Sequence, residues 1–356
     1  MDDQFERLAN LRLRDFVPRA AARRPLTDVP RAAVPAVDAH NHLGRWLTED
    51  WASPDVGGLL EVMDASNVRA IVNLDGMVGE ELDANLDRYD RAHPGRFATF
   101  AQWDRGLFAT GAWRELGEQV AEAARRGAKG LKVWKDLGLH LRDDRGELVM
   151  PDDPRLDPVW DACVDAGIPV TIHVGDPVAF FWPLDERNER VEELLAHPDW
   201  WFGDRERFPP LERILEALEQ LIARRSDVTF IGAHVLCLAE DVAWVARMLD
   251  TYPNAYADIA ARIPELGRVP RAARELILRH ADRVVLGTDA FPPDAAVYAT
   301  HFRFLETADE YFPYEPSEDE PPREGRWAIS GLDLPADVLE RVYGGNALRL
   351  ISGLGE

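Results

Sequence analysis

Four histidines and one aspartate stand at the ends of apolar runs in this sequence. His40 and His42 lie in VDAHNH, while His173, His234 and Asp289 end the runs PVTIH, TFIGAH and VVLGTD. Imidazole nitrogens and carboxylate oxygens bind divalent cations, and two imidazoles on one strand face can chelate one ion. The simpler alternative is a set of buried polar side chains that hydrogen bond to one another. Grouped without a cation, these residues would carry a heavy desolvation cost, so the sequence predicts a metal site.

The five residues can meet only if the segments that carry them are neighbouring strands. Short apolar or β-branched runs alternate with longer segments of helical period, such as 113–126 and 211–225. Eight strands, each followed by a helix, indicate an α/β fold of the (β/α)8 TIM-barrel type, built as a single domain over residues 1–356. Active sites of such barrels form at the C-terminal ends of the strands. The expected strands are 36–42, 69–74, 97–102, 128–133, 169–173, 229–234, 255–258 and 284–288.

The first strand is expected to alternate its side chains between two environments. Residues two apart on a strand share a face of the sheet. This spacing predicts that Asp38, His40 and His42 face the barrel axis. Val37 and Ala39 are then expected to face the surrounding helices.

Three segments fall outside the regular alternation. Residues 1–34 precede the first strand and are expected to cover the barrel or to pack alongside it. Residues 174–210 are an insertion after strand 5, rich in Phe and Trp. The insertion is interpreted as a lid or substrate wall, or else as a satellite core or subunit contact. Residues 309–331 are expected to be an acidic, solvated and extended excursion, because 309–324 hold seven acidic residues, one Arg and four Pro.

Composition excludes several classes of function. The 356 residues include 41 Lys and Arg against 64 Asp and Glu, a formal net charge of −23. That charge argues against a general nucleic-acid binder and against docking on anionic lipid. Cys163 and Cys237 lie far apart in no CxxC pattern, so neither a disulfide framework nor a thiolate zinc site is expected. The charged N-terminus lacks the apolar core of a signal peptide, and no apolar stretch could span a bilayer. The expectation is a soluble cytoplasmic protein.

Taken together, the strand-end motifs resemble those of the amidohydrolase superfamily. The resemblance is strongest to the branch that includes aminocarboxymuconate-semialdehyde decarboxylase-like proteins, and it covers nearly the whole chain. It implies a TIM barrel in which His40, His42, His173 and Asp289 bind the metal. It also implies that His234 helps to activate a metal-bound water or binds substrate, and that Asp289 also accepts a proton from that water. The motifs are VDAHNH (37–42), TIHVGDP (171–177), FIGAHV (230–235), VLGTDAFPP (285–293) and GGNALRLI (344–351).

Two basic residues at strand ends have open roles. Lys132 ends the fourth strand, where binuclear members of the superfamily carry a carboxylated lysine that bridges two metals. It is otherwise expected to be a free cation for substrate or to pair with a barrel carboxylate. Arg262 follows the seventh strand and is expected either to bind a substrate carboxylate or to form a surface salt bridge. Asp258, on that strand, is expected to orient a ligating histidine.

Other polar and aromatic residues carry weaker expectations. The candidates to line the pocket are Asp75, Trp46, Trp103 and Phe291, which follow strand ends. No function is assigned to the histidines outside the strand ends, which are His93, His140, His197, His280 and His301.

The expected activity is that of a metal-dependent hydrolase. Its metal-activated water would attack an amide, lactone or ester of a small organic substrate. Three imidazoles and one carboxylate favour Zn²⁺ over Mn²⁺, Fe²⁺ or Co²⁺. One alternative is a metal-dependent, non-oxidative decarboxylase of a small aromatic or unsaturated acid, and another is a non-catalytic ligand-binding barrel. The expected partner is a small molecule, and family members often form homo-oligomers.

Overall fold

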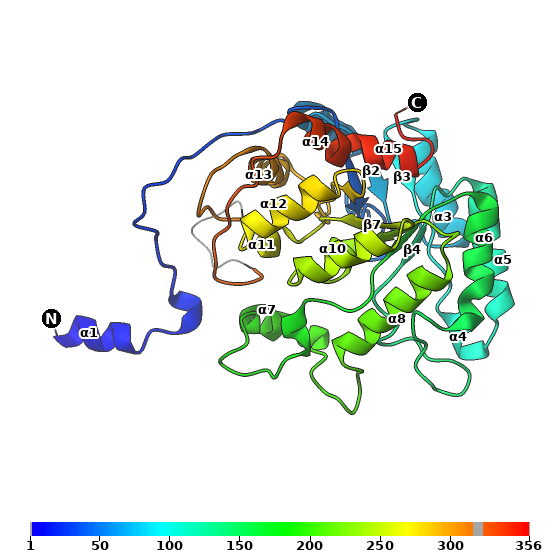
Figure 1. Cartoon of the computed structure of the whole chain (residues 1–356), viewed down its shortest axis with the longest axis horizontal. Helices are drawn as coiled ribbons and strands as arrows, with labels where there is room; N and C mark the ends of the chain where they lie inside the picture. The colour runs from blue at the N-terminus through cyan, green and yellow to red at the C-terminus, as the bar shows by residue number, and fades with distance from the viewer. Residues whose placement is uncertain (1, 316–322, 356) are drawn as a thin grey trace.

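The computed structural model describes residues 2–315 and 323–355 (Figure 1). All eight expected strands occur among these residues, although most end earlier than the sequence predicts. Neighbouring strands pair in parallel, in the orders β1-β2-β3 and β4-β5-β6-β7-β8. The strands are β1 (Ala36–Asn41), β2 (Val68–Asn73), β3 (Phe97–Thr99), β4 (Leu131–Val133), β5 (Val170–Ile172), β6 (Phe230–Gly232), β7 (Ala255–Asp258) and β8 (Val284–Val285).

Backbone hydrogen bonds join the two sheets at both seams. Between β3 and β4, the N–H of Ala101 donates to Gly130 O at 2.9 Å, and the N–H of Lys132 donates to Ala101 O at 2.7 Å. Between β1 and the segment that continues β8, the N–H of Ala39 donates to Leu286 O at 2.8 Å. These bonds continue the strand pairing around a ring, as the predicted TIM barrel requires.

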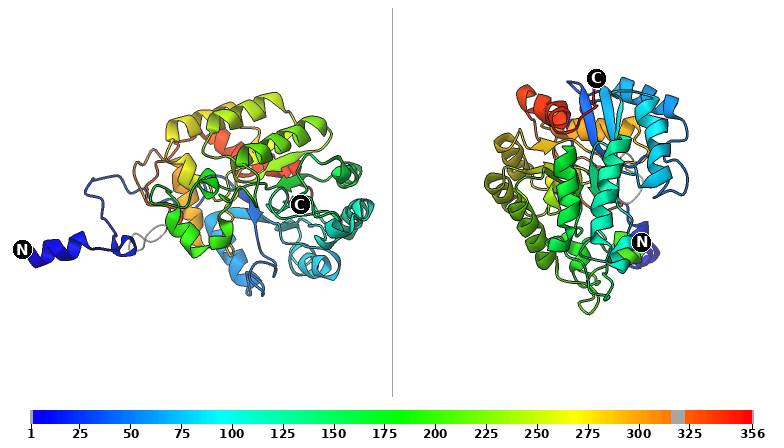
Figure 2. Two further views of the ribbon diagram at one scale, coloured as in Figure 1. Left: turned by 90° about the horizontal axis from the view of Figure 1, so that it is seen from below. Right: turned by 90° about the vertical axis from the view of Figure 1, so that its right-hand side faces the viewer.

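Helices cover the outside of the barrel (Figures 1 and 2). The helical periods expected over 113–126 and 211–225 are observed as α5 and α8, whose buried side chains recur every three or four residues. Within the described chain, no helix has the length and apolar character needed to cross a membrane. The helices are α1 (Asp2–Ala9), α2 (Val56–Ser66), α3 (Gly79–Leu86), α4 (Gly106–Thr110), α5 (Trp113–Arg126), α6 (Asp157–Ala166), α7 (Val191–Ala196), α8 (Leu211–Arg224), α9 (Ala233–Leu236), α10 (Val242–Thr251), α11 (Ile263–Leu266), α12 (Pro270–Arg279), α13 (Ala295–Glu306), α14 (Ala336–Glu340) and α15 (Asn346–Leu350).

The inside of the barrel away from the strand-end histidines is apolar. Val37 and Ala39 of β1 belong to a buried cluster that includes side chains of β2, β3, β6 and β8. Ala347 and Ile351, at the C-terminal helix α15, pack on the same cluster. The expectation that Val37 and Ala39 face the helices is therefore wrong.

A β-bulge explains this reversal. The pairing of β1 with β2 shifts between Asp38 and Asn41, so β1 has one more residue there than β2. An extra residue changes which face the following side chains occupy. Asp38 consequently points outward, where the hydroxyl of Tyr298 on α13 donates to its Oδ2 at 3.3 Å. His40 still points inward, because it lies in the stretch between Asp38 and Asn41 where the pairing shifts.

The N-terminal segment is only partly attached to the barrel. Residues 4–23 are exposed, and α1 stands away from the rest of the chain (Figures 1 and 2). The guanidinium of Arg326 donates to Leu13 O at 2.7 Å and to Phe16 O, and the backbone N–H of Thr27 donates to Asp309 Oδ2 at 2.9 Å. Ala32 is buried. The segment from Leu13 onward therefore contacts the rest of the protein, as expected, whereas α1 does not pack alongside the barrel.

The insertion of residues 174–210 lines the cavity at the strand ends and also packs into the main core. Phe181, Phe202 and Phe208 are buried against one another, with ring centroids 5.0–5.3 Å apart in the two closest pairs. They belong to the same buried cluster as the outer core of the barrel, so the alternative of a separate satellite core is wrong. Phe180 and Trp200 instead line the large cavity at the strand ends.

The acidic excursion is not solvated throughout. Phe312 is buried and pairs with Ile329 through two backbone hydrogen bonds of 2.8 Å. Tyr314 is buried as well, and Glu324 forms an ion pair with Arg190 of the insertion at 3.0 Å. The expectation of a solvated extended segment is therefore wrong for both ends of the excursion, and residues 316–322 lie outside the described chain.

Candidate metal centre

In both histidines at the end of β1, the ring nitrogen Nδ1 contacts a carboxylate oxygen. Nδ1 of His40 lies 2.7 Å from Asp258 Oδ2, and Nδ1 of His42 lies 2.7 Å from Asp75 Oδ1. Both rings then present Nε2 toward Asp289, with Nε2 to Oδ1 distances of 3.8 Å for His40 and 3.3 Å for His42. A histidine that ligates a metal commonly donates its other ring N–H to a carboxylate in this way. The geometry fits a cation between Nε2 of both rings and Asp289.

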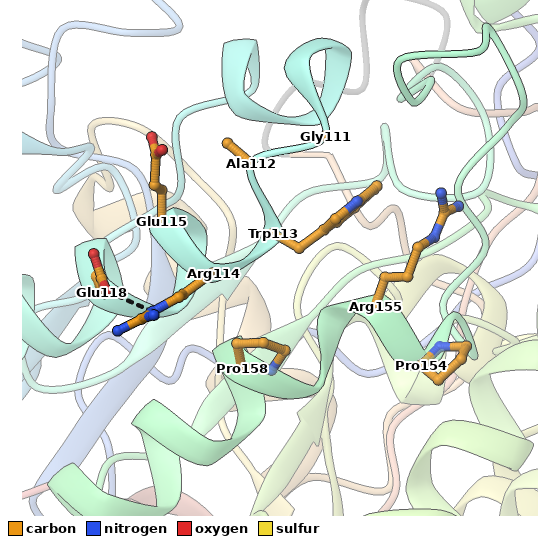
Figure 3. Close-up of a pocket in the computed structure, with 9 residues that line it drawn as sticks. All are labelled: Gly111, Ala112, Trp113, Arg114, Glu115, Glu118, Pro154, Arg155 and Pro158. Carbon is orange, nitrogen blue, oxygen red and sulfur yellow. Dashed lines mark hydrogen bonds and ion pairs between the residues drawn. The ribbon is translucent and has the colours of Figure 1, made fainter.

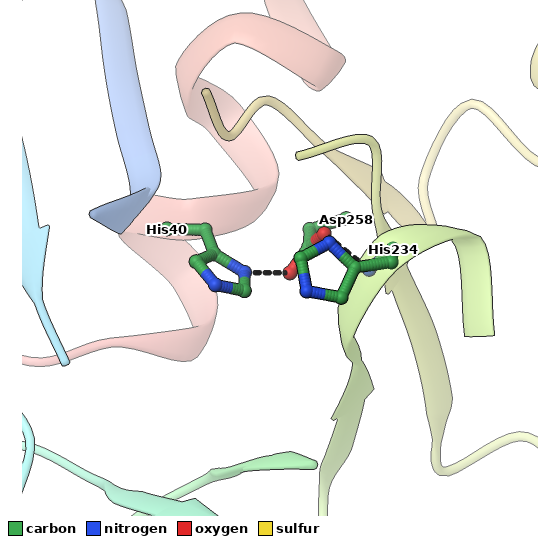
Figure 4. A group of neighbouring side chains, drawn as sticks. All are labelled: His40, His234 and Asp258. Atoms are coloured by element: carbon green, nitrogen blue, oxygen red, sulfur yellow. Dashed lines mark hydrogen bonds and ion pairs between the residues drawn. The ribbon is translucent and has the colours of Figure 1, made fainter. Parts of the chain in front are cut away.

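Asp258 contacts both His40 and His234 (Figure 4), and these three residues offer ligand atoms that lie within 4.8 Å of one another. Its Oδ2 faces His40, and its Oδ1 accepts the backbone N–H of His234 at 2.8 Å and that of Ala260 at 3.1 Å. Burial raises the pKa of Asp258 to about 6, while these hydrogen bonds act in the opposite direction. The prediction that Asp258 orients a ligating histidine agrees with these contacts. Ligand atoms of His40, His42 and Asp289 form a second group within 4.8 Å of one another.

His173 is a buried histidine whose ring lacks hydrogen bonds. Among the described residues, neither ring nitrogen has a hydrogen-bond partner, although Nε2 lies 3.4 Å from Asp176 Oδ1. Burial lowers the pKa of His173 to about 4, so the imidazole is neutral. A buried imidazole nitrogen without a partner is costly. The lone pair of His173 is therefore suited to a cation, although its nitrogens lie outside the tight group formed by His40, His42 and Asp289.

His234 lies beside His173 and has a defined tautomer. Its Nδ1 lies 2.8 Å from the carbonyl oxygen of Ala260, so Nδ1 carries the proton and Nε2 carries the lone pair. Nε2 lies 3.9 Å from Asp289 Oδ2, and the ring centroid lies 4.4 Å from that of His173. Burial lowers the pKa of His234 well below its usual range. His234 is thus a neutral base that faces the second oxygen of Asp289.

Lys132 lies inside the same cluster. Its Nζ is 3.3 Å from His40 Nε2, and it lies 5.3 Å from the centre of the Trp134 ring. Burial lowers the pKa of Lys132, and it forms no ion pair with a carboxylate in the described chain. The alternative in which Lys132 pairs with a barrel carboxylate is therefore wrong here. The amine and a metal ion would compete for the same lone pair of His40.

A cavity of about 1040 Å³ opens from the strand-end cluster. Its wall includes His42, His173, His234 and Asp289, together with residues of the insertion and of α13. Arg262 also lines it and is buried, so its expected alternative as part of a surface salt bridge is wrong. The guanidinium makes one hydrogen bond, to Ala261 O, and no ion pair within the described chain. Its remaining N–H groups are suited to a ligand carboxylate.

Not all of the aromatic candidates reach this cavity. Phe291 lines it, as expected, but Trp103 is buried against Phe108 and Trp160 in the outer core. Trp46 packs on Trp134, at 4.7 Å between ring centroids.

Asp75 does not line the cavity either, since its role is the contact with His42. Two histidines to which no function was assigned, His197 and His301, do line it. Neither lies at a strand end or in a recognisable motif, so the sequence carried no signal for them.

A separate hollow lies outside the barrel, at the start of α5 and of α6 (Figure 3). Trp113 and Arg155 face each other across it, with the guanidinium carbon 4.4 Å from the ring centre. Histidine is absent from its lining, and its carboxylates are those of Glu115 and Glu118. The hollow therefore offers no comparable site for a metal.

Comparisons with known proteins identify the family. Among solved structures, the chain is similar to 2,6-dihydroxybenzoate decarboxylase from Rhizobium, with a TM-score of 0.55, 15% identity, and coverage of 89% of this chain and 98% of that one. It is also similar to a TIM-barrel protein of Bordetella bronchiseptica (0.53, 16%, 88% and 97%). A third likeness is to a dihydroxybenzoic acid decarboxylase from Polaromonas with bound manganese and an inhibitor, 2-nitroresorcinol (0.52, 15%, 89% and 96%).

At this level of identity, these structures establish the TIM-barrel fold. No curated protein sequence matches the chain. The amidohydrolase family profile matches residues 37–352, which include the barrel and every strand-end residue described above. The chain therefore belongs to the amidohydrolase family, as its motifs predicted.

Proposed function

We propose that the chain is a metal-dependent hydrolase of small organic acids that carry an ester, lactone or amide bond. The observation that carries the proposal is the pair of proton acceptors at the cluster. His234 Nε2 has a lone pair, and it faces Asp289 Oδ2 at 3.9 Å. Hydrolysis requires a water molecule to lose protons as it attacks, and two adjacent bases serve that need.

The proposed ligands are His40, His42, His173 and Asp289, with Zn²⁺ or Mn²⁺ as the ion. A divalent ion held there supplies Lewis acidity and makes hydroxide available near neutral pH. Asp258 and Asp75 keep Nε2 of the two β1 histidines unprotonated.

The remaining residues hold the substrate and move protons. Asp289 Oδ2 accepts the first proton of the attacking water, and His234 Nε2 accepts a proton or hydrogen bonds to the oxygen on which charge develops. Arg262 holds a carboxylate of the substrate through its free N–H groups.

Non-oxidative decarboxylation is the second candidate. A buried guanidinium without an ion pair suits a substrate whose carboxylate is the reacting group, as well as one whose carboxylate only anchors it. Two of the structurally similar proteins are named as decarboxylases of dihydroxybenzoates. In that reaction, a protonated group beside the cavity would have to deliver a proton to the carbon that loses CO₂.

Isotope labelling separates the two reactions. Protein loaded with Zn²⁺ or Mn²⁺ is incubated in H₂¹⁸O with aromatic lactone and ester acids, and separately with 2,6-dihydroxybenzoate. Hydrolysis predicts one ¹⁸O in the carboxylate formed at each cleaved bond and no CO₂, and His234→Asn should reduce the rate about 100-fold. Release of CO₂ without ¹⁸O uptake would establish decarboxylation instead. Absence of both, in protein that binds metal, would leave a ligand-binding barrel.

Metal stoichiometry tests the role of Lys132. If Lys132 is a free cation, the parent protein binds about one ion per chain, and Lys132→Met binds it more tightly because the competing amine is gone. If Lys132 is carboxylated and bridges two ions, the parent binds about two and Lys132→Met binds fewer. Inductively coupled plasma mass spectrometry measures the metal content, with His40→Ala as the control that loses it.

A further inference from the structure

We infer that His301 of α13 recognises the substrate by accepting a hydrogen bond from a hydroxyl or N–H group on it. This inference rests on the proposed function, because it concerns the same cavity and the same class of small organic acids. His301 is 6% exposed and lines the cavity, and no motif of the family includes it. The structure therefore assigns a second polar contact to the ligand, in addition to Arg262.

The tautomer of His301 is fixed by its own helix. Nδ1 lies 2.8 Å from the carbonyl oxygen of Val297, one turn earlier, and a carbonyl can only accept. Nδ1 therefore carries the ring proton, and Nε2 carries a lone pair. Burial lowers the pKa of His301 to about 4, so the ring stays neutral at physiological pH. His301 can thus accept a hydrogen bond at Nε2 but cannot donate one there.

That acceptor has no partner within residues 2–315 and 323–355. A buried polar atom without a hydrogen bond is costly, and native structures contain few of them. His301 is the only histidine that combines such an atom with the cavity wall outside the strand-end cluster, as far as the described chain goes. His280 also has a buried Nε2 without a hydrogen bond, but it lies away from the cavity.

Arg262 and His301 together define the ligand more closely. Arg262 offers donors without an ion-pair partner, which a carboxylate satisfies. His301 offers a lone pair, which a carboxylate or an ether oxygen cannot satisfy, whereas a hydroxyl, an amine or an amide N–H can. The substrate class is therefore a small organic acid that also carries a hydroxyl or N–H group away from the carboxylate.

Binding of matched benzoates tests this inference without any turnover. The probes are benzoate and its 3- and 4-substituted hydroxy, amino and methoxy derivatives, titrated calorimetrically into the full-length, metal-loaded protein. Methoxy is the decisive substituent, because it keeps the oxygen of the hydroxyl but has no hydrogen to donate. At one ring position, we expect the hydroxy and amino acids to bind about 10-fold or more tightly than the methoxy and unsubstituted acids.

Variants then assign the preference to one residue. His301→Phe should reduce the hydroxy-to-methoxy ratio to about one, while His301→Gln, which retains an acceptor, should keep part of it. His280→Phe is the matched control and should leave the ratio unchanged. Arg262→Met should weaken all of the acids by a similar factor without changing the ratio. Circular dichroism melting checks that each variant is folded. If His301→Phe does not fold, the hydroxy-to-methoxy ratio of His301→Gln tests the role of His301.

The outcomes separate this inference from the proposed function. A ratio that persists in His301→Phe, a parent that shows no preference, or a parent that binds none of the acids would each overturn the role of His301. A preference that depends on His301 in a protein without hydrolytic activity would support the recognition role and overturn only the proposed reaction.

Discussion

Replacing Asp258 with Asn should weaken metal binding while leaving the fold intact. Asn retains an oxygen that can accept the backbone N–H groups of His234 and Ala260, now at 2.8 and 3.1 Å. Its amide nitrogen then faces Nδ1 of His40, where Oδ2 now lies at 2.7 Å. An amide N–H requires an acceptor, so the ring proton of His40 moves to Nε2. The lone pair that would bind the metal is then lost.

The size of the effect follows from this change of tautomer. Replacement of a group that orients a ligating histidine typically costs 10–100-fold in metal affinity. That range corresponds to about 1.4–2.8 kcal/mol of binding free energy. The backbone contacts of Asp258 survive in the variant, so the metal-free protein should unfold at a similar urea concentration. Asp289→Asn removes a proposed ligand and should cost more than Asp258→Asn.

Competition with a fluorescent chelator measures the affinity for Zn²⁺ or Mn²⁺. The matched controls are Asp64→Asn, which changes an exposed carboxylate paired with Arg96, and Asp75→Asn. Asp75 Oδ2 has no hydrogen-bond partner in the described chain, so the amide of Asp75→Asn can keep its oxygen on His42 Nδ1, and this variant should lose less metal affinity than Asp258→Asn. Affinity unchanged from the parent would show that the His40 tautomer does not depend on Asp258. A loss equal to that of Asp289→Asn would instead make Asp258 a ligand. Either result would refute the reasoning from the hydrogen bonds.

Three further predictions follow from buried contacts. In Gly287→Ala, the new Cβ would lie 2.7 Å from His40 Cβ. Urea unfolding should therefore show a free energy of unfolding lower by about 1–3 kcal/mol, and the metal should bind more weakly. Stability and metal affinity equal to those of the parent would contradict this prediction. Arg190→Met leaves the carboxylates around Arg190 without their counter-ion. It should lower the free energy of unfolding by about 3–5 kcal/mol in the same assay. A decrease below about 1 kcal/mol would mean that water solvates the unpaired carboxylates instead. Burial raises the pKa of Cys163 and Cys237 to about 12, so both thiols stay protonated at pH 8. They should therefore react with a thiol reagent about a thousand-fold more slowly in the native than in the unfolded protein. Rapid labelling of the native protein would contradict their burial.

The sequence predicted the barrel because short apolar or β-branched runs alternate with segments of helical period along the chain. It predicted the ends of the strands less well, since His173, His234 and Asp289 all lie beyond the last paired residue. These side chains need backbone directions that a regular strand does not provide. Only the sheet pairing reveals the residue at which each strand ends, because the residue types before and after that position are similar.

The sequence predicted which strand-end residues lie together but not all of the residues that support them. The role of Asp258 could be expected from its place at the end of a neighbouring strand. The role of Asp75 was missed, since its contact with His42 depends on how the chain turns after β2. The faces of Val37 and Ala39 were reversed by a bulge that strand alternation does not signal. His301 was missed because nothing in the α13 sequence, AAVYATHFRFLE, distinguishes a cavity-lining histidine from a core histidine.

The backbone around the site is strained, and the strain has a common support. His234, Ala261 and Asp289 have φ values of 56°, 51° and 58°, in the left-handed region that non-glycine residues rarely occupy. Each such residue costs roughly 1–3 kcal/mol unless the surrounding structure holds it in place. Asp258 accepts the backbone N–H of His234, and the N–H of Asp289 donates to His40 O at 2.9 Å. The bonds that hold His234 and Asp289 in these conformations thus involve His40 and its carboxylate partner Asp258, so the directions of His40, His234 and Asp289 are fixed together rather than one by one.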